Sequence, residues 1–154
     1  MQITRMADYA TRVLIHLAAL PVGTRANRVT LAKLADVPTE FLGKVLQALT
    51  RGGLIHSHRG VNGGFELARA GSQISMLDII EAIEGPISLN VCTAYPEACP
   101  RQWWCAAHDV WREAQDAMKS VLSAANVEQL AQKSTVNREV RPLIQMGAGG
   151  AEWS

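Results

Sequence analysis

Apolar and polar positions near the start of the chain alternate with the period of an amphipathic helix. Apolar side chains recur at helical spacing from Tyr9 to Leu20, and Thr4 stands where an N-cap is needed. Pro21 and Gly23 follow as helix terminators. The pattern therefore predicts a first helix that buries one face.

Two shorter helical patterns follow, separated by a tight turn. The first covers residues 30–35 with Thr30 as its cap, and the second begins at Thr39 and stops at Gly52. Phe41 and the apolar residues after it form the expected inner face of the second helix, which leaves a polar outer face. Such a pair predicts a helix-turn-helix unit, whose second helix fits the major groove of DNA.

Two short strands are predicted next, over residues 54–58 and 65–67. The glycine-rich turn between them, residues 59–64, can adopt backbone conformations closed to other residues and carries the charge of Arg59. A charged hairpin placed after a helix-turn-helix is typical of a wing that reaches the adjacent minor groove. The expected fold class is therefore mainly α with a small β wing.

The remainder of the chain divides into three parts. A helix is expected over residues 74–84, and residues 87–105 form a long segment without a sustained period. A helical stripe of apolar residues then runs from Val110 to Ala125; it predicts a dimerisation helix, the alternative being that it packs on its own domain. We expect four regions: the winged helix-turn-helix domain (1–86), a cysteine-rich segment (87–108), the dimerisation helix with a following short helix (109–134) and a partly disordered tail (135–154).

Charge is distributed unevenly along the chain. The net charge is only +1, yet residues 1–66 hold eight basic and four acidic side chains, which gives +4, and the remainder sums to −3. This asymmetry points to a polyanionic partner for the first part. The longest apolar stretch, 13–22, is interrupted by His16 and is too short to span a membrane. The first residues carry an acid, Asp8, where a secretion signal would have basic residues before an apolar run. We therefore expect a cytoplasmic protein without a membrane partner.

Three cysteines, Cys92, Cys99 and Cys105, lie in one short segment. An odd number in a chain without secretion features argues against a disulfide framework and for metal binding or redox chemistry. Thiolates suit an iron-sulfur cluster or zinc, and the absence of a Cys-x2-Cys pair lowers the zinc interpretation. The competing candidates for a fourth ligand are His108, one turn after Cys105, and Asp8, supplied from a second subunit.

Other interpretations of the cysteine segment stay open. The thiols could hold structural zinc, or sense oxidants directly through disulfides without a metal. A small thiol redox enzyme is disfavoured, because the chain has no Cys-x-x-Cys pair, phosphate loop, nucleophile elbow or paired acids. Trp103 and Trp104 could shield a cluster from solvent, but packing of the loop is the simpler role for them.

Several of these motifs together are familiar: MQITR (1–5) with DYA (8–10), HRGVNGGF (58–65) and the cysteine segment ending in CAAHDVWR (105–112). From Met1 to about Ser134 the chain resembles the Rrf family of iron-sulfur winged-helix transcription regulators, the IscR, NsrR and RirA type. The resemblance implies a dimeric bacterial transcription factor, usually a repressor, whose cluster state changes its affinity for operator DNA or its choice of operator.

The resemblance leaves the type of cluster open. Asp8 is similar to the acidic ligand of the nitric-oxide-sensing NsrR type, which holds a 4Fe-4S cluster. Cys105-x2-His108 looks like the IscR type, which holds a 2Fe-2S cluster through that histidine and regulates cluster assembly. With Asp8 and His108 this chain combines features of both types. In addition, its first cysteine gap is one residue longer than the usual spacer.

The DNA contacts are expected from the exposed side of the third helix, from the wing and from the start of the first helix. Gly43 would allow this helix to approach the DNA closely. The basic contacts would make DNA binding depend on salt. A symmetric dimer would favour a pseudo-palindromic operator. The expected contact residues are Thr39, Glu40, Lys44, Gln47, Arg51, Arg59, Asn62 and Arg5.

Overall fold

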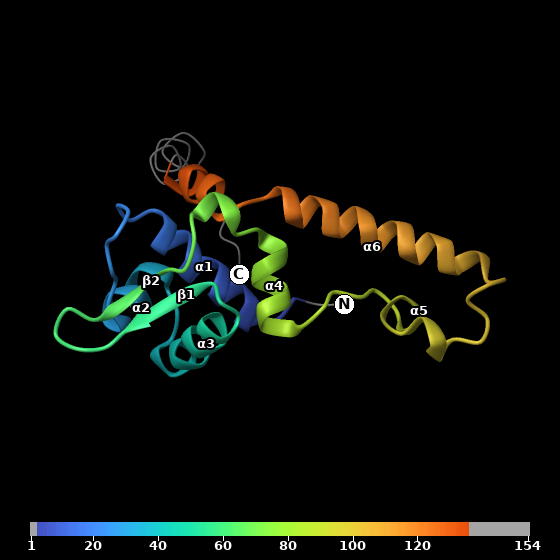
Figure 1. Cartoon of the computed structure of the whole chain (residues 1–154), viewed down its shortest axis with the longest axis horizontal. Coiled ribbons are helices and arrows are strands. Elements are labelled where there is room, and N and C mark those ends of the chain that lie inside the picture. The colour runs from blue at the N-terminus through green and yellow to red at the C-terminus, as the bar shows by residue number, and fades with distance from the viewer. Residues whose placement is uncertain (1–2, 136–154) are drawn as a thin grey trace, which may run out of the picture.

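The computed structural model of the chain describes residues 3–135 and forms a helical body from which an arm projects (Figure 1). The expected tail, apart from Thr135, lies outside the described residues. A last helix covers residues 127–135. The preceding elements are α1 (Arg5–Ala18), α2 (Arg28–Ala35), α3 (Thr39–Arg51), β1 (Ile55–His58), β2 (Gly64–Leu67), the 3-10 turn η1 (Gly71–Gln73), α4 (Met76–Glu84), α5 (Val91–Ala94), the 3-10 turn η2 (Pro96–Ala98) and α6 (Ala106–Ala124).

Side-chain caps fix where the helices of the body begin. Thr4 accepts a hydrogen bond from the N–H of Ala7 at the start of α1, as expected. The expected start of α2 is two residues late, because the cap is Asn27, whose side-chain oxygen accepts from the N–H of Thr30 at 2.9 Å. The expected start of α4 is two residues early, because Ser75 is its cap.

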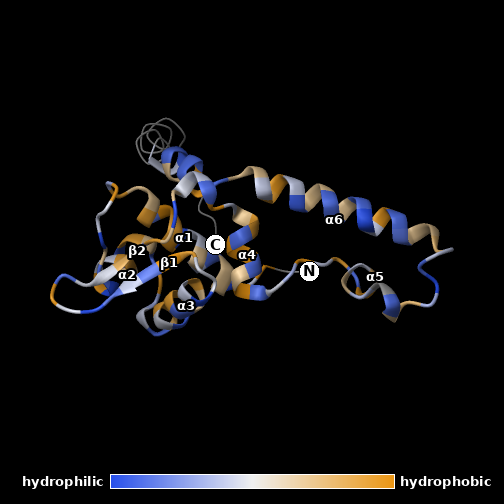
Figure 2. Ribbon diagram, viewed as in Figure 1, coloured by the Kyte–Doolittle hydropathy of each residue, from blue (hydrophilic) through white to orange (hydrophobic). Residues whose placement is uncertain are grey.

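The core of the body lies where α1, α3 and α4 meet. Leu14 of α1, Leu49 of α3 and Ile79 of α4 are fully buried and belong to one cluster that also takes in Ile55 of β1. Figure 2 shows these helices with apolar faces turned inward and polar faces turned outward. Phe41 was expected inside but is 47% exposed, with its ring 6.0 Å from that of Tyr9.

The wing is a two-stranded antiparallel hairpin with Ile55 opposite Leu67 and His58 opposite Gly64. A bridge between Ala26 and Phe65 joins it to the loop before α2. At Gly64, where φ is +145°, a Cβ would lie 2.8 Å from the carbonyl oxygen of Ala26. Glycine is therefore required where the hairpin meets that loop.

The arm, residues 88–124, contains more structure than its sequence predicts. The segment expected to be a plain loop contains α5 and η2, and α6 begins directly after Cys105. Figure 1 shows α6 running away from the body, with α5 near its far end. None of the described helices is both long enough and apolar enough to span a membrane.

Candidate nucleic-acid interface and cysteine site

The basic residues of the body fall into two groups by their partners. Arg12 pairs with Asp8 at 2.7 Å and Arg25 with Glu66 at 3.5 Å. Within residues 3–135 a second group, all exposed, forms no ion pair with a carboxylate. Its members up to residue 66 are Arg5, Arg28, Lys33, Lys44, Arg51 and Arg59.

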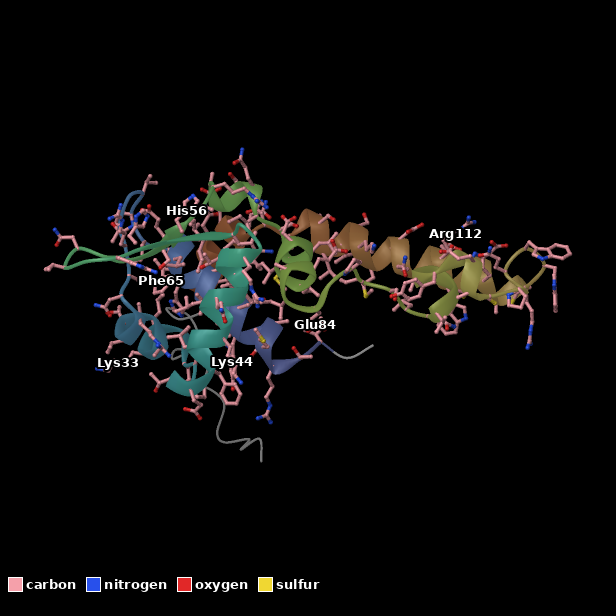
Figure 3. All side chains as sticks on the ribbon, turned by 60° about the horizontal axis from the view of Figure 1, so that its bottom comes forward. Lys33, Lys44, His56, Phe65, Glu84 and Arg112 are labelled. Atoms are coloured by element: carbon pink, nitrogen blue, oxygen red, sulfur yellow. The ribbon has the colours of Figure 1, made fainter. Side chains whose placement is uncertain are left out.

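The outer face of α3 contains part of this second group. Leu42, Val45 and Leu49 anchor the opposite face in the core. Figure 3 shows Lys44 on the same side of the body as Lys33 of α2. The expected contact residues of this helix are all exposed: Thr39, Glu40, Lys44, Gln47 and Arg51.

A network of polar contacts braces the wing. His58 Nε2 lies 2.6 Å from Glu66 Oε1, and Arg25 donates to the carbonyl oxygen of Asn62 at 3.4 Å as well as pairing with Glu66. Burial would raise the pKa of Glu66, but the hydrogen bond from His58 and the charges of Arg25 and His58 outweigh burial and lower it. Arg25 thereby ties Asn62, at the exposed tip that also carries Arg59, to the loop before α2.

A hollow of about 350 Å³ lies between α3 and the wing. Its lining residues are Arg28, Gly43, Leu46, Gln47, Thr50, Arg51, Ser57 and Phe65. Sequence reasoning missed Arg28, because only the packing of α2 against α3 places it here. No sequence signal could have identified it.

The three cysteines occupy successive positions along the arm. Cys92 lies in α5, Cys99 follows η2 and Cys105 is the N-cap of α6; all three are half-buried free thiols. Among the described residues, no three His, Cys, Asp or Glu side chains converge closely enough to hold a metal ion. The donor set suits an iron-sulfur cluster in kind, but its geometry is not assembled in the single chain.

His108 has an unsatisfied nitrogen. Its Nδ1 is buried and has no hydrogen-bond partner within the described part of the chain, while its backbone N–H donates to the carbonyl of Cys105 at 2.9 Å. Buried polar atoms are almost always satisfied, so this nitrogen is an available ligand atom beside Cys105. Both residues line a hollow of about 470 Å³ together with Trp103 and Trp104.

Asp8, the competing ligand, has a different setting. Its carboxylate pairs with Arg12 on α1, in the body, whereas α5 lies toward the far end of the arm (Figure 1). A single chain does not bring Asp8 together with the cysteines. The remaining route for Asp8 is the one expected from sequence, in which a second subunit supplies it.

The expectation that the tryptophans pack the loop is wrong. Trp103 is 82% exposed and Trp104 is 61% exposed in the single chain. Large apolar side chains at such exposure, at the far end of the arm, indicate a surface that another molecule covers.

The apolar stripe predicted for α6 divides between two faces. Met118 and Leu122 turn toward the rest of the chain, as does Gln115. A second line of small apolar residues, at alternating spacings of three and four, is exposed along its whole length, and we call it the seam. It consists of Ala107, Val110, Ala114, Ala117, Val121 and Ala124.

These features define a winged helix-turn-helix protein with an exposed basic surface, the architecture of DNA-binding transcription regulators. Residues 3–133 match the Rrf2 family, described as iron-dependent transcriptional regulators, and the chain belongs to this family. The family assignment confirms the resemblance drawn from sequence.

Individual relatives agree with this assignment. An HTH-type transcriptional regulator of Mycobacterium tuberculosis (strain H37Rv) is 34% identical over 131 residues, 85% of this chain and 81% of the relative. Protein aau3 of Rhizobium meliloti is 33% identical over 132 residues, 84% of each chain. The matched family and the relative from Mycobacterium tuberculosis are described as transcriptional regulators, not as enzymes, so the thiol redox enzyme is set aside.

Solved structures share the fold. CymR, the global cysteine regulator of B. subtilis, is 28% identical with a TM-score of 0.72, covering 86% of this chain and 98% of its own. IscR of T. potens is 19% identical with a TM-score of 0.69, covering 87% and 88%. At the latter identity the likeness concerns the fold alone.

Proposed function

We propose that this Rrf2 protein is a cytoplasmic homodimer that binds a pseudo-palindromic operator, as a repressor, and that an iron-sulfur cluster on Cys92, Cys99 and Cys105 controls this binding. The observation that carries the proposal is the unsatisfied Nδ1 of His108 beside Cys105. It supports a bound group at the base of α6. The cluster, 2Fe-2S or 4Fe-4S, would supply a centre that reacts with nitric oxide or oxidants.

DNA binding is assigned to α3, the wing and the start of α1. Exposed cations without carboxylate partners retain their full charge for phosphates. Glu40 is the exception in sign, and its carboxylate suits an exposed cytosine amino group in the major groove. The remaining assigned contacts are Thr39, Lys44, Gln47, Arg51, Arg59, Asn62 and Arg5.

Dimerisation is assigned to the seam of α6. Spacings of three and four keep Val110, Ala114 and Val121 on one side of the helix, and their small side chains allow two helices to approach closely. The seam faces away from the chain's own core, which supports a second copy rather than the body as its partner. Dimerisation would also provide a route for the partner's Asp8 to reach the cysteines.

Coupling between the cluster and DNA is assigned to the contacts where the arm joins the body. Ile87 donates its backbone N–H to Glu81 of α4 at 3.3 Å, and Lys119 of α6 pairs with the same carboxylate at 3.7 Å. Release of the cysteine segment would loosen these contacts and shift the two wings of the dimer relative to each other.

A second candidate is direct thiol sensing without a metal, which the separated free thiols favour. Anaerobic purification followed by an absorption spectrum with iron, sulfide and zinc analysis distinguishes the two. Equal iron and sulfide in a coloured protein support the cluster, and band shape separates 2Fe-2S from 4Fe-4S. A colourless protein, with or without zinc, overturns it.

The ligand and control functions are tested by substitution. Replacing all three cysteines by serine should leave a folded dimer that still binds DNA but no longer changes affinity with redox state. His108→Ala and Asp8→Ala should differ, since only the variant that removes the true fourth ligand should alter the spectrum. An unchanged redox response in the triple variant would contradict the proposal.

A further inference from the structure

Arg28 crosses from α2 onto the surface of α3. Its Nη2 donates to the carbonyl oxygen of Thr39 at 3.1 Å, which fixes the guanidinium against the first turn of α3. A guanidinium has five N–H donors, so most of them remain free of this contact. Within residues 3–135 no carboxylate pairs with Arg28.

Gly43 provides the space for this guanidinium. A Cβ built on Gly43 would lie 2.8 Å from Nη2 of Arg28 and 3.5 Å from its Cζ, with no other side chain so close. The side-chain position that α3 leaves empty at residue 43 is thus filled by a cation from another helix. The two residues act as one unit.

The hollow beside this pair differs from the other hollows described on the protein. Arg28, Gln47, Arg51 and Ser57 supply donors around it, and no carboxylate lines it. Three other hollows on the described residues each contain at least one acidic residue: Asp8 in the first, Glu66 in the second and Asp109 in the hollow at Cys105. Leu46 and Phe65 also line the hollow, so the features that suit an anion are its two guanidinium groups, Arg28 and Arg51, which no carboxylate of the lining opposes.

The position of the hollow identifies the anion. In a winged helix, the recognition helix enters the major groove and the wing reaches the adjacent minor groove. The DNA backbone that separates these two grooves must pass between α3 and the wing, where this hollow lies. We infer that Arg28, for which Gly43 leaves the space, binds a backbone phosphate of the bound DNA. This inference rests on the proposed DNA-binding function.

Three variants test this phosphate contact: Arg28→Ala, Gly43→Ala and the double variant. Affinity is measured against salt for two labelled duplexes, one selected by the wild type from a random-sequence library and one with the same bases scrambled. Circular dichroism, thermal unfolding and dimer mass are recorded for each variant. Lys133→Ala removes an exposed charge from the last helix and is the matched control.

Arg28→Ala should weaken binding to both duplexes by about tenfold, as expected for a hydrogen bond to a charged group. It should also reduce the slope of log K against log salt by about 0.9, the value for one phosphate contact. Gly43→Ala displaces only the flexible end of Arg28, so its Tm should equal or exceed that of the wild type while its affinity falls. In the Arg28→Ala protein, Gly43→Ala should not lower the affinity for DNA any further.

Four results overturn the inference. Arg28→Ala could bind both duplexes as the wild type does, or lose affinity only for the selected duplex, which would indicate base reading. Gly43→Ala could bind DNA as tightly as the wild type. Alternatively, Gly43→Ala could lower the affinity of the Arg28→Ala protein as much as it lowers that of the wild type, which would mean that Gly43 acts independently of Arg28. A wild type that binds neither duplex would overturn the proposed function as well, and this outcome is distinct from the other four.

Discussion

The side-chain carbonyl of Gln115 accepts a hydrogen bond from the backbone N–H of Leu89 at 3.2 Å and so ties the middle of α6 to the segment that leads to the cysteines. Gln115 is 9% exposed and is the one buried polar side chain among residues 3–135. A buried amide that makes a single long-range contact in this way is a structural joint within the arm, between α6 and the segment before α5.

We predict that Gln115→Leu, which keeps a similar volume, destabilises the protein by about 1–3 kcal/mol, because the half-buried N–H of Leu89 loses its acceptor. Chemical denaturation measures the change. Limited proteolysis should also cut the cysteine segment faster. Gln129→Leu, on an exposed side chain of the last helix, is the control and should stay within about 0.5 kcal/mol; equal stability of the two variants would contradict the prediction.

Arg25 links the wing to the loop before α2 through Glu66 and the carbonyl of Asn62. We predict that Arg25→Ala speeds amide hydrogen exchange at residues 59–63 and weakens DNA binding several-fold, because the wing tip loses its brace. The control is Lys133→Ala, which removes the same charge without touching the wing. Wild-type exchange rates at the wing tip of Arg25→Ala would show that the brace is not needed.

The seam of α6 offers a direct test of dimerisation. Val121→Asp should raise the dissociation constant of the dimer at least about tenfold, because a carboxylate in an apolar helix contact loses its water. Ser123→Asp introduces the same charge at an exposed position on another side of the helix and should leave the dimer intact. Analytical ultracentrifugation measures both; a dimer unaffected by Val121→Asp would place the contact elsewhere.

The body was predictable because its signals are local. Thr4 before an amphipathic run and a glycine-rich turn between short strands specify a helix and a hairpin without tertiary information. The errors occur where two local signals compete. Asn27 caps α2 ahead of Thr30, and the Ser75 cap leaves Ile74 as a fully buried extended residue before α4.

The site was less predictable, because it depends on contacts between distant segments. Periodicity shows that α6 is apolar on one side, but only packing against α4 separates Met118 from the exposed Val121. Likewise, the place of Arg28 over Gly43 follows from the packing of two helices. The clustering of the cysteines is visible in sequence, whereas their spatial convergence is not.

The capping box of α4 makes part of the stability depend on pH. Burial would raise the pKa of Asp78, but the backbone N–H and hydroxyl of Ser75, with the charge of Arg69, outweigh burial and lower it below its usual 3.8. A carboxyl whose pKa is lower in the folded state stabilises the fold above its unfolded value. That contribution is lost as the pH falls through the folded value.

We therefore predict that Asp78→Asn lowers Tm at pH 7 by a few degrees, the usual effect of losing a cap worth about 1 kcal/mol. The Tm difference between the wild type and Asp78→Asn should be constant from pH 7 to pH 5 and should shrink as the pH falls below 3.8. Thermal unfolding followed by circular dichroism over this range measures it. Glu97→Gln is the control, because it removes an exposed carboxyl in η2, on the arm and outside the capping box of α4. A difference for Asp78→Asn that stays the same down to pH 3 would mean that the charge of Asp78 contributes nothing and that its hydrogen bonds alone hold the start of α4.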